Sequence, residues 1–354
     1  MPDANRVLHI RAGDEARQQL RDGPLRQQDI GMMLGASGGP KWLALYGLDR
    51  YLFGHFFRHR QTPLQVLGSS AGAWRFACFA QNDPVAATER FARGYIDAAF
   101  PRGMSVADIT QASKTLLHTV MDSQQHAAEI LANPVVRLNL VVARARAITA
   151  ARHPGAQMAG LALAASANAL SRRLLGAFFE RVIFHRDSTS PFAGLNDLPT
   201  RHVPLSGNNL HDAVLASGSI PMVLDAVENI AGAGPGRYFD GGVTDYHFDL
   251  PLPGDALVLY PHFYSHAIPG WFDKSLPWRR AGGSHYQRVV MVSPSPEWVD
   301  SLPHGKIPDR KDFARLDDDD RRRYWNRTLE HSQQLADAFD RFVQQPAAFA
   351  IDGF

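Results

Sequence analysis

The chain has 354 residues, of which 45% are hydrophobic and 20% are charged, and this is an ordinary globular composition. Its formal net charge of +2 is too small to indicate a nucleic-acid partner. Its single cysteine, Cys78, excludes a disulfide-dense secreted scaffold.

The hydrophobic residues are not arranged as a targeting or membrane-spanning segment. Residues 1–20 are polar and lack the apolar region of a signal peptide. The longest apolar-leaning stretch, residues 158–170, is shorter than the roughly 20 residues that a membrane span needs. We therefore expect a cytoplasmic protein whose contact with a membrane, if any, is peripheral.

Short continuous apolar runs alternate with segments that carry apolar residues at helical spacing. Such runs are typical of strands covered on both faces of a sheet. The predicted strands are residues 30–34, 64–67, 138–142, 182–184, 256–259 and 289–292. The predicted helices are residues 42–57, 71–80, 161–179 and a long, charged amphipathic helix at 321–343.

Alternating strands and helices predict the α/β class, as a three-layer α/β/α sandwich with a mostly parallel central sheet. The Pro- and Gly-rich residues 251–283 are expected to form a long surface loop region around one strand. No shift in composition marks a boundary, so we expect a single domain over residues 1–354. Its core would span about 29–295, followed by a C-terminal helical extension at about 305–354.

The first motif with chemical meaning is the G-x-S-x-G pattern formed by Gly68, Ser70 and Gly72. It lies between a predicted strand and a predicted helix. A sharp strand-to-helix turn exposes a serine hydroxyl above the helix N-terminus, and flanking glycines keep the turn uncrowded. This context favours Ser70 as a nucleophile over a chance match.

The second motif, Leu-Gly-Ala-Ser-Gly-Gly-Pro-Lys at residues 34–41, also follows a strand and opens a helix. Backbone N–H groups of Gly38 and Gly39 can point at one spot and stabilise an oxyanion. A nucleotide-binding loop needs a lysine directly after the last glycine, and here Pro40 separates Gly39 from Lys41. A simple glycine turn is the remaining alternative.

The third motif is Asp240 at the end of a short aromatic strand, followed by Gly241 and Gly242. By itself it is most simply a tight turn. With the other two motifs present, Asp240 becomes a candidate general base. A solvated aspartate is too weak a base at neutral pH, so burial beside Phe239 and Val243 must raise its pKa.

In chain order, the glycine-rich loop, G-x-S-x-G and D-G-G resemble the signature of patatin-like phospholipases. Residues 215–221, Leu-Ala-Ser-Gly-Ser-Ile-Pro, also resemble the A-S-x-x-I-P stretch that precedes D-G-G in that family. The resemblance covers roughly residues 30–252 and implies a patatin-like fold. The tail after about residue 270 resembles nothing that we can name.

The resemblance implies a lipid acyl hydrolase or carboxylic ester hydrolase, phospholipase A-like, that works through a Ser–Asp dyad and an acyl-enzyme. Ser70 falls on the family's nucleophile and Asp240 on its base. Gly38 and Gly39 fall on the oxyanion loop, and the N–H of Ala71 is the expected further donor. The implied partner is a lipid or small ester substrate; no cofactor is expected, and no pattern predicts an oligomeric state.

Two positions depart from the family's pattern. Residues 36–39 read Ala-Ser-Gly-Gly where the family commonly has D-G-G-G, and Trp42 replaces the usual glycine after the basic position near Lys41. Pro40 has no N–H to donate. The altered loop motivates a second interpretation, a catalytically silent lipid-binding protein on the same fold.

A conventional Ser-His-Asp esterase is the other alternative, because histidines follow Asp240 in the required order. The candidates are His247, His262, His285 and His304. No metal site is expected: His55 and His59 are four residues apart, but no acidic third ligand lies nearby in the sequence.

The predicted helix at residues 161–179 allows two interpretations. Leu170, Leu174 and Phe178 follow at four-residue steps on one face, with Leu175 and Phe179 beside them. Such a stripe most often packs on a core. Alternatively, it dips among acyl chains while Arg172 and Arg173, at its polar edge, meet anionic head groups.

Overall fold

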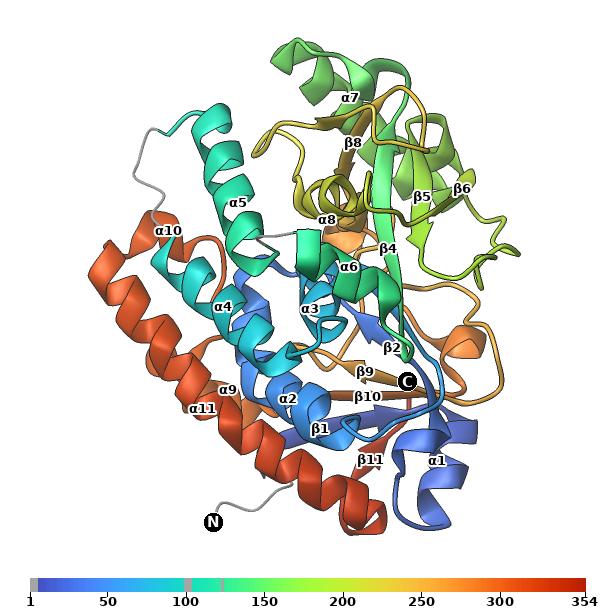
Figure 1. The fold of residues 1–354 in the computed structure, drawn as a ribbon, viewed down its shortest axis with the longest axis vertical. Coiled ribbons are helices and arrows are strands. Elements are labelled where there is room, and N and C mark those ends of the chain that lie inside the picture. The colour runs from blue at the N-terminus through green and yellow to red at the C-terminus, as the bar shows by residue number, and fades with distance from the viewer. Residues whose placement is uncertain (1–5, 99–103, 122–123) are drawn as a thin grey trace.

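A central sheet of mostly parallel strands, flanked by helices, forms an α/β/α sandwich (Figure 1). The structure, a computed structural model, describes residues 6–98, 104–121 and 124–354. The predicted fold class is therefore confirmed.

The strands include all six that the sequence predicts, and the predicted aromatic strand before Asp240. They are β1 (Leu8–Ala12), β2 (Ile30–Gly35), β3 (Leu64–Ser69), β4 (Val136–Ala145), β5 (Phe179–His185), β6 (Thr200–Pro204), β7 (Val227–Glu228), β8 (Arg237–Asp240), β9 (Leu257–Pro261), β10 (Val289–Pro294) and β11 (Ile351–Asp352).

The α-helices lie mainly between the strands in the chain. They are α1 (Asp14–Arg21), α2 (Tyr46–Tyr51), α3 (Ala71–Phe79), α4 (Pro84–Asp97), α5 (Val106–Val120), α6 (Gln124–Ala132), α7 (Pro154–Leu170), α8 (Leu210–Gly218), α9 (Pro296–Asp300), α10 (Asp312–Arg315) and α11 (Asp318–Gln344). Short 3-10 or π segments are η2 (Gln27–Asp29), η3 (Gly39–Leu45), η4 (Leu52–Phe56), η5 (Ala147–Ala150), η6 (Arg172–Ala177), η7 (Gly241–Val243), η8 (Trp271–Ser275), η9 (Gly283–Tyr286), η10 (Pro303–Gly305) and η11 (Pro346–Ala348).

Strand order explains how distant motifs meet. The sheet runs β11-β1-β10-β9-β2-β3-β4-β5-β6, with β8 paired to β4 and β7. The five strands β10, β9, β2, β3 and β4 are mutually parallel. On β4, Val141 pairs with Ser69 of β3, and its neighbour Val142 pairs with Asp240 of β8. The serine motif and the aspartate motif therefore end at the same place on the sheet.

The predicted helix at residues 161–179 is wrong in its second half. The α-helix ends at Leu170, Ser171 is extended (φ −159°, ψ 132°), and Phe179 begins β5. Strand pairing decides the outcome, because Phe179 pairs with Ala145 and is 1% exposed. Local helical spacing is a weak preference that such tertiary pairing overrides. The expected stripe of Leu170, Leu174 and Phe178 is therefore not one helical face.

Residues 251–283 are less superficial than predicted. The strand expected there is present as β9, but His262, Phe263 and Asp273 are buried. The segment returns into the interior of the molecule and reaches the serine motif, as described below. Its high Pro and Gly content reflects irregular backbone, not exposure.

The C-terminal helix α11 is confirmed and lies along α2 (Figure 1). The N–H of Gly47 donates to Ser332 Oγ at 2.8 Å, and the Tyr51 hydroxyl donates to Asp340 at 2.6 Å. Among the helices of residues 6–98, 104–121 and 124–354, none is long and apolar enough to cross a membrane.

Candidate active site

Ser70 occupies the turn between the end of β3 and the start of α3. Its backbone has φ 54° and ψ −127°, a conformation that is strained for a residue with a side chain. Its N–H donates to Ser217 Oγ at 2.9 Å. A Cβ at residue 72 would lie 1.9 Å from the Gly35 carbonyl oxygen, so only glycine allows α3 to approach β2 this closely.

Asp240 ends β8 and meets Ser70 directly. The Ser70 hydroxyl donates to Asp240 Oδ2 at 2.6 Å, and the N–H of Gly242 donates to Oδ1 at 2.7 Å. The N–H of Asp240 donates to the Ser219 carbonyl at 2.8 Å. The structure thus brings the two predicted dyad residues within hydrogen-bond distance, with both carboxylate oxygens occupied.

The electrostatic environment of Asp240 makes it a stronger base than a solvated aspartate. Burial raises the pKa of Asp240 to about 6, although the hydrogen bonds from Ser70 and Gly242 act in the opposite direction. Burial favours the neutral acid, and donated hydrogen bonds favour the carboxylate. The rise in pKa that the sequence required is therefore present.

The predicted oxyanion residues border the same serine. Gly38 and Gly39 line a small cavity together with Ser70 and Asp240, and Gly39 has φ +55°. Within the described part of the chain, the N–H groups of Gly38, Gly39 and Ala71 have no hydrogen-bond partner. Three amide donors beside a serine hydroxyl are the chemistry that an oxyanion needs.

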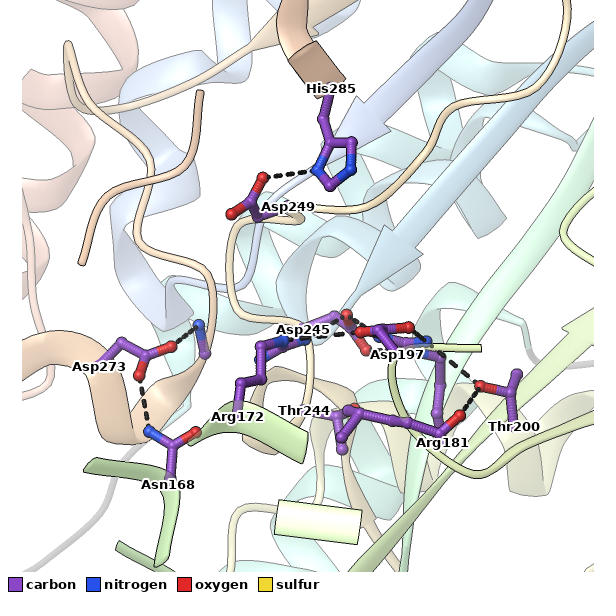
Figure 2. A network of polar contacts seen from close by, with 12 residues as sticks. Asn168, Arg172, Arg181, Asp197, Thr200, Thr244, Asp245, Asp249, Asp273 and His285 are labelled. Atoms are coloured by element: carbon purple, nitrogen blue, oxygen red, sulfur yellow. Dashed lines mark hydrogen bonds and ion pairs between the residues drawn. The ribbon is translucent and has the colours of Figure 1, made fainter. Parts of the chain in front are cut away.

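A buried ionic network holds the turn that follows Asp240 (Figure 2). Arg181 donates to Asp245 at 2.7 and 2.8 Å and to Asp197 at 2.7 and 2.9 Å. Arg172 donates to Asp245 at 3.0 Å. Burial lowers the pKa of Arg181, but the two carboxylates outweigh burial and hold that pKa above its ordinary value. Arg172 is thus committed to this network and does not lie at the edge of a lipid-facing helix.

Hydrogen bonds of Asp273, next to this ionic network, hold the segment η8. The buried carboxylate of Asp273 accepts from Asn168 at 2.6 Å (Figure 2). It also accepts from Arg279 at 2.9 Å and from the N–H of Gly270 at 2.8 Å. These bonds hold η8 against the end of α7. Since leaving a buried charge unpaired is costly, these bonds favour this position of η8.

The four histidines of the alternative triad are engaged elsewhere. His247 accepts from the N–H of Ile268 at 3.0 Å, and His262 accepts from the N–H of Tyr264 at 2.9 Å. His285 contacts Asp249 at 2.9 Å (Figure 2), and the His304 ring lies against Tyr324. None of the four lines either cavity that Ser70 lines.

An apolar cavity of about 520 Å³ opens beside Ser70. Its walls come from α3, α4, α5, α8, the segment after α8, and residues 310–313. They include Trp74, Phe91, Tyr95, Ile109, Leu116, Leu215, Ile220, Val223, Leu224 and Phe313. This volume and lining are typical of a site for an apolar ligand.

A second, polar cavity of about 50 Å³ also borders Ser70. It is lined by Asp240 and by three cationic side chains, Lys41, Lys274 and Arg310. The two cavities share Ser70, Gly39, Ile220 and Arg310, so they meet at the serine.

Several residues of the site were not found from the sequence. Ser217 and Ser219 lie in the stretch that resembles A-S-x-x-I-P, and this stretch was the available signal for them. Lys274 and Arg310 lie in segments without a motif, so nothing local marks them. They are placed by the buried bonds of Asp273 and by the packing of residues 306–313.

Comparison with known protein families supplies the remaining finding. A family model described as patatin-like phospholipase matches residues 36–247, more than half of the chain. No curated protein matches the sequence. The matched range contains Ser70, Asp240 and the glycine loop, and it excludes Lys274 and Arg310.

Proposed function

The chain belongs to the patatin-like phospholipase family, and we propose that it hydrolyses acyl esters through Ser70 and Asp240. Family membership supports lipid ester hydrolysis in general. The finer proposal, a Ser–Asp dyad that forms an acyl-enzyme, is carried by one observation: the 2.6 Å hydrogen bond from the Ser70 hydroxyl to Asp240.

In the first half-reaction, Asp240 takes the proton of Ser70 as Oγ forms a bond to the ester carbonyl carbon. The tetrahedral intermediate then collapses, its bond to the alcohol oxygen breaks, and Asp240 returns the proton to the departing alcohol. In the second half-reaction, Asp240 takes a proton from water, the hydroxide oxygen attacks the acyl-enzyme, and Ser70 leaves with that proton. The aspartate thus does the work that histidine does in a triad.

The oxyanion of each tetrahedral intermediate would accept hydrogen bonds from the N–H groups of Gly38, Gly39 and Ala71. Their freedom from other partners supports this role. Such donors act on charge that develops only during the reaction, so they lower the barrier rather than merely bind the ester. Pro40 contributes no donor, and the loop still offers two consecutive glycine amides.

The acyl chain would occupy the apolar cavity. The cavity reaches Ser70 and is bordered by large apolar and aromatic side chains such as Trp74, Phe91 and Leu116. Burying a chain there removes apolar surface from water, at roughly 0.8 kcal/mol per CH₂. This supports a lipid substrate with an extended acyl chain over a short, compact ester. The catalytically silent alternative would need the same cavity but not the hydrogen bond between Ser70 and Asp240, and that bond favours catalysis.

Contact with a membrane would be peripheral and made by exposed apolar side chains near η8 and α7. Leu170 is 82% exposed and Trp278 is 72% exposed. Arg279 donates to the carbonyls of Asn168 and Ala169, which places Trp278 beside the end of α7. The exposed Arg173 and Arg280 nearby complement an anionic lipid surface.

Fluorophosphonates test the proposal, because only an activated serine reacts with them. A dodecyl fluorophosphonate should label Ser70, identified by peptide mass spectrometry, and should do so faster than an ethyl analogue. Ser70→Ala should abolish both the labelling and the ester hydrolysis. An adduct on another serine with Ser70 unmodified would refute the nucleophile, and equal rates for both reagents would refute the acyl cavity.

A further inference from the structure

The C-terminal end of helix α8 contacts the main chain of both proposed catalytic residues. The N–H of Ser70 donates to Ser217 Oγ at 2.9 Å, and the N–H of Asp240 donates to the Ser219 carbonyl at 2.8 Å. Ser217 and Ser219 lie at the end of α8, and neither is more than 1% exposed. One helix end therefore borders both the turn of the nucleophile and the strand end of the base.

The backbone of Ser70 depends on its surroundings. Its φ of 54° and ψ of −127° are unfavourable for a residue with a side chain, and such a conformation persists only where neighbouring groups hold it. Helix α3 holds the Ser70 carbonyl, which accepts from the N–H groups of Ala73 and Trp74 at 2.9 and 3.2 Å. The Ser70 N–H has a single acceptor among the residues that the structure describes, and this acceptor is the Ser217 hydroxyl.

The hydroxyl of Ser217 is oriented to accept this hydrogen bond. It donates its own proton to the Val141 carbonyl at 2.8 Å, which leaves its lone pairs for the Ser70 N–H. Val141, on β4, pairs with Ser69, the residue before the nucleophile. A Cβ at position 241 would lie 2.1 Å from the same carbonyl oxygen, so the turn after the proposed base also closes on this group. The Ser217 hydroxyl is thus anchored where both motifs meet β4.

The two contacts from α8 differ in what they require of the sequence. The contact from Ser219 uses a main-chain carbonyl, which any residue at that position supplies. The contact from Ser217 uses a side-chain hydroxyl, and alanine there would leave the buried N–H of Ser70 without an acceptor. The turn would then relax toward an ordinary backbone conformation, and the Ser70 hydroxyl would move away from Asp240.

We propose that Ser217 is a positioning residue for the reaction: its hydroxyl holds Ser70 in the strained turn and so keeps the Ser70 hydroxyl directed at Asp240. This inference rests on the proposed function. Ser217 lines neither of the two cavities that border Ser70, so it acts through the nucleophile and not on the substrate. A displacement of about 1 Å at a reacting group can lower a rate about a hundredfold, so such a residue has a measurable effect on turnover.

The test compares Ser217→Ala with Ser219→Ala on a soluble, neutral short-chain ester. Both changes remove one buried hydroxyl from the same helix end, but the Ser219 hydroxyl donates to the Leu215 carbonyl within α8, at 3.0 Å. Per folded molecule, with the folded fraction measured by denaturant unfolding, kcat should fall roughly tenfold to hundredfold in Ser217→Ala. The rate at which an ethyl fluorophosphonate labels Ser70 should fall by a similar factor. Ser219→Ala should keep both rates close to those of the wild type.

The pH dependence of kcat/KM separates positioning from a general loss of packing. Burial raises the pKa of Asp240, and the hydrogen bond from Ser70 opposes this rise, so weakening that bond raises the pKa further. The fall of kcat/KM on the acid side should therefore move to higher pH in Ser217→Ala and stay in place in Ser219→Ala. If Ser217→Ala does not fold, Ser217→Cys takes its place, because a thiol fills the site but is a weaker acceptor. The same changes are then expected with smaller size.

The outcomes distinguish the positioning role from the proposed function. If the wild type hydrolyses esters and is labelled at Ser70, but Ser217→Ala matches Ser219→Ala in kcat, labelling rate and pH profile, the positioning role fails alone. Wild-type values in a folded Ser217→Cys would overturn it in the same way. If the wild type hydrolyses no ester and the fluorophosphonate leaves Ser70 unmodified, the proposed function fails and the positioning role falls with it.

Discussion

The family-matched region and the C-terminal region contribute different things to one site. Residues 36–247 supply Ser70, Asp240 and the glycine loop, all attached to strand ends of the central sheet. The remaining C-terminal residues supply Lys274 from a short 3-10 segment and Arg310 from a loop. The first group is placed by backbone pairing, and the second by side-chain hydrogen bonds and packing.

Because the two groups of residues are placed by different interactions, the residues proposed for the reaction and those that border the substrate can change independently. Strand register brings Ser70 and Asp240 within hydrogen-bond distance, and on the proposed function any change there alters the reaction itself. Side chains carried by irregular segments can change without disturbing the sheet. We therefore expect substitutions in the first region to lower turnover more than substitutions in the second.

Among substitutions in the family-matched region other than Ser70→Ala, Asp240→Asn is expected to cause the largest loss of turnover. The amide keeps the shape and can still hold the serine hydroxyl, but it cannot accept its proton. We expect kcat on a soluble short-chain ester to fall about 10³-fold or more, in the upper part of the range for loss of general base catalysis.

The histidines provide the control for this substitution. His285→Ala and His304→Ala should keep most of the activity, because both side chains contact other groups. His247→Ala and His262→Ala remove buried rings, so their activity must be corrected for the folded fraction. A folded histidine variant with a loss as large as that of Asp240→Asn would restore the triad interpretation.

The pH dependence of kcat/KM tests whether Asp240 is the general base. Only the carboxylate form of Asp240 can accept a proton, and its pKa is about 6. On a neutral ester, kcat/KM should therefore be level above pH 7 and fall about tenfold per unit below pH 6. A neutral ester is needed because Lys274, with a pKa of about 7, would add its own titration to the profile of an anionic one.

Circular dichroism across the same pH range shows whether the fold persists. A profile that stays level down to pH 4.5 in the folded protein would mean that Asp240 is not the base. Replacing Lys274 by Gln removes a positive charge that lowers the pKa of Asp240, so the fall in the profile of the neutral ester should move to higher pH.

The smallest expected effect concerns delivery to a lipid surface. Leu170→Ser combined with Trp278→Ser should lower activity on anionic vesicles roughly threefold to tenfold, because two apolar side chains no longer enter the lipid. Activity on a soluble short-chain ester and the thermal midpoint should change little, since both residues are exposed.

Ile148→Ser is the matched control, because Ile148 is 38% exposed and lies near Gly160 in the middle of α7, away from its C-terminal end. It should leave vesicle activity unchanged. Equal losses on vesicles and on the soluble ester would show that the double variant disturbs the fold, and the surface would then not be interfacial.

The sequence predicted the features that local chemistry encodes. Ser70 is recognisable because a strand, two glycines and a helix surround it. The strands β2, β3 and β9 are recognisable because buried parallel strands are continuously apolar. The raised pKa of Asp240 followed from the requirement for a base. The serine turn and these strands depend on residues within a few positions of one another, whereas the raised pKa of Asp240 depends on burial in the folded chain.

The features that were missed depend on contacts between distant segments. Residues 171–179 have helical spacing, but Phe179 pairs with Ala145 and draws the chain into β5. Arg172 was expected at a polar edge and instead binds Asp245, 73 positions away. Lys274 reaches the site because Asp273 is held by Asn168, 105 positions away. No local pattern reports such partners.

The meeting of the two cavities at Ser70 has a consequence for the fate of the acyl-enzyme. On the proposed mechanism, the acyl chain fills the apolar side, so the alcohol departs from the cationic side and water must enter by the same opening. Another alcohol that occupies this opening would compete with water for the acyl group. The partition between hydrolysis and acyl transfer would then be decided by whether water or an alcohol occupies this opening, and not by the dyad.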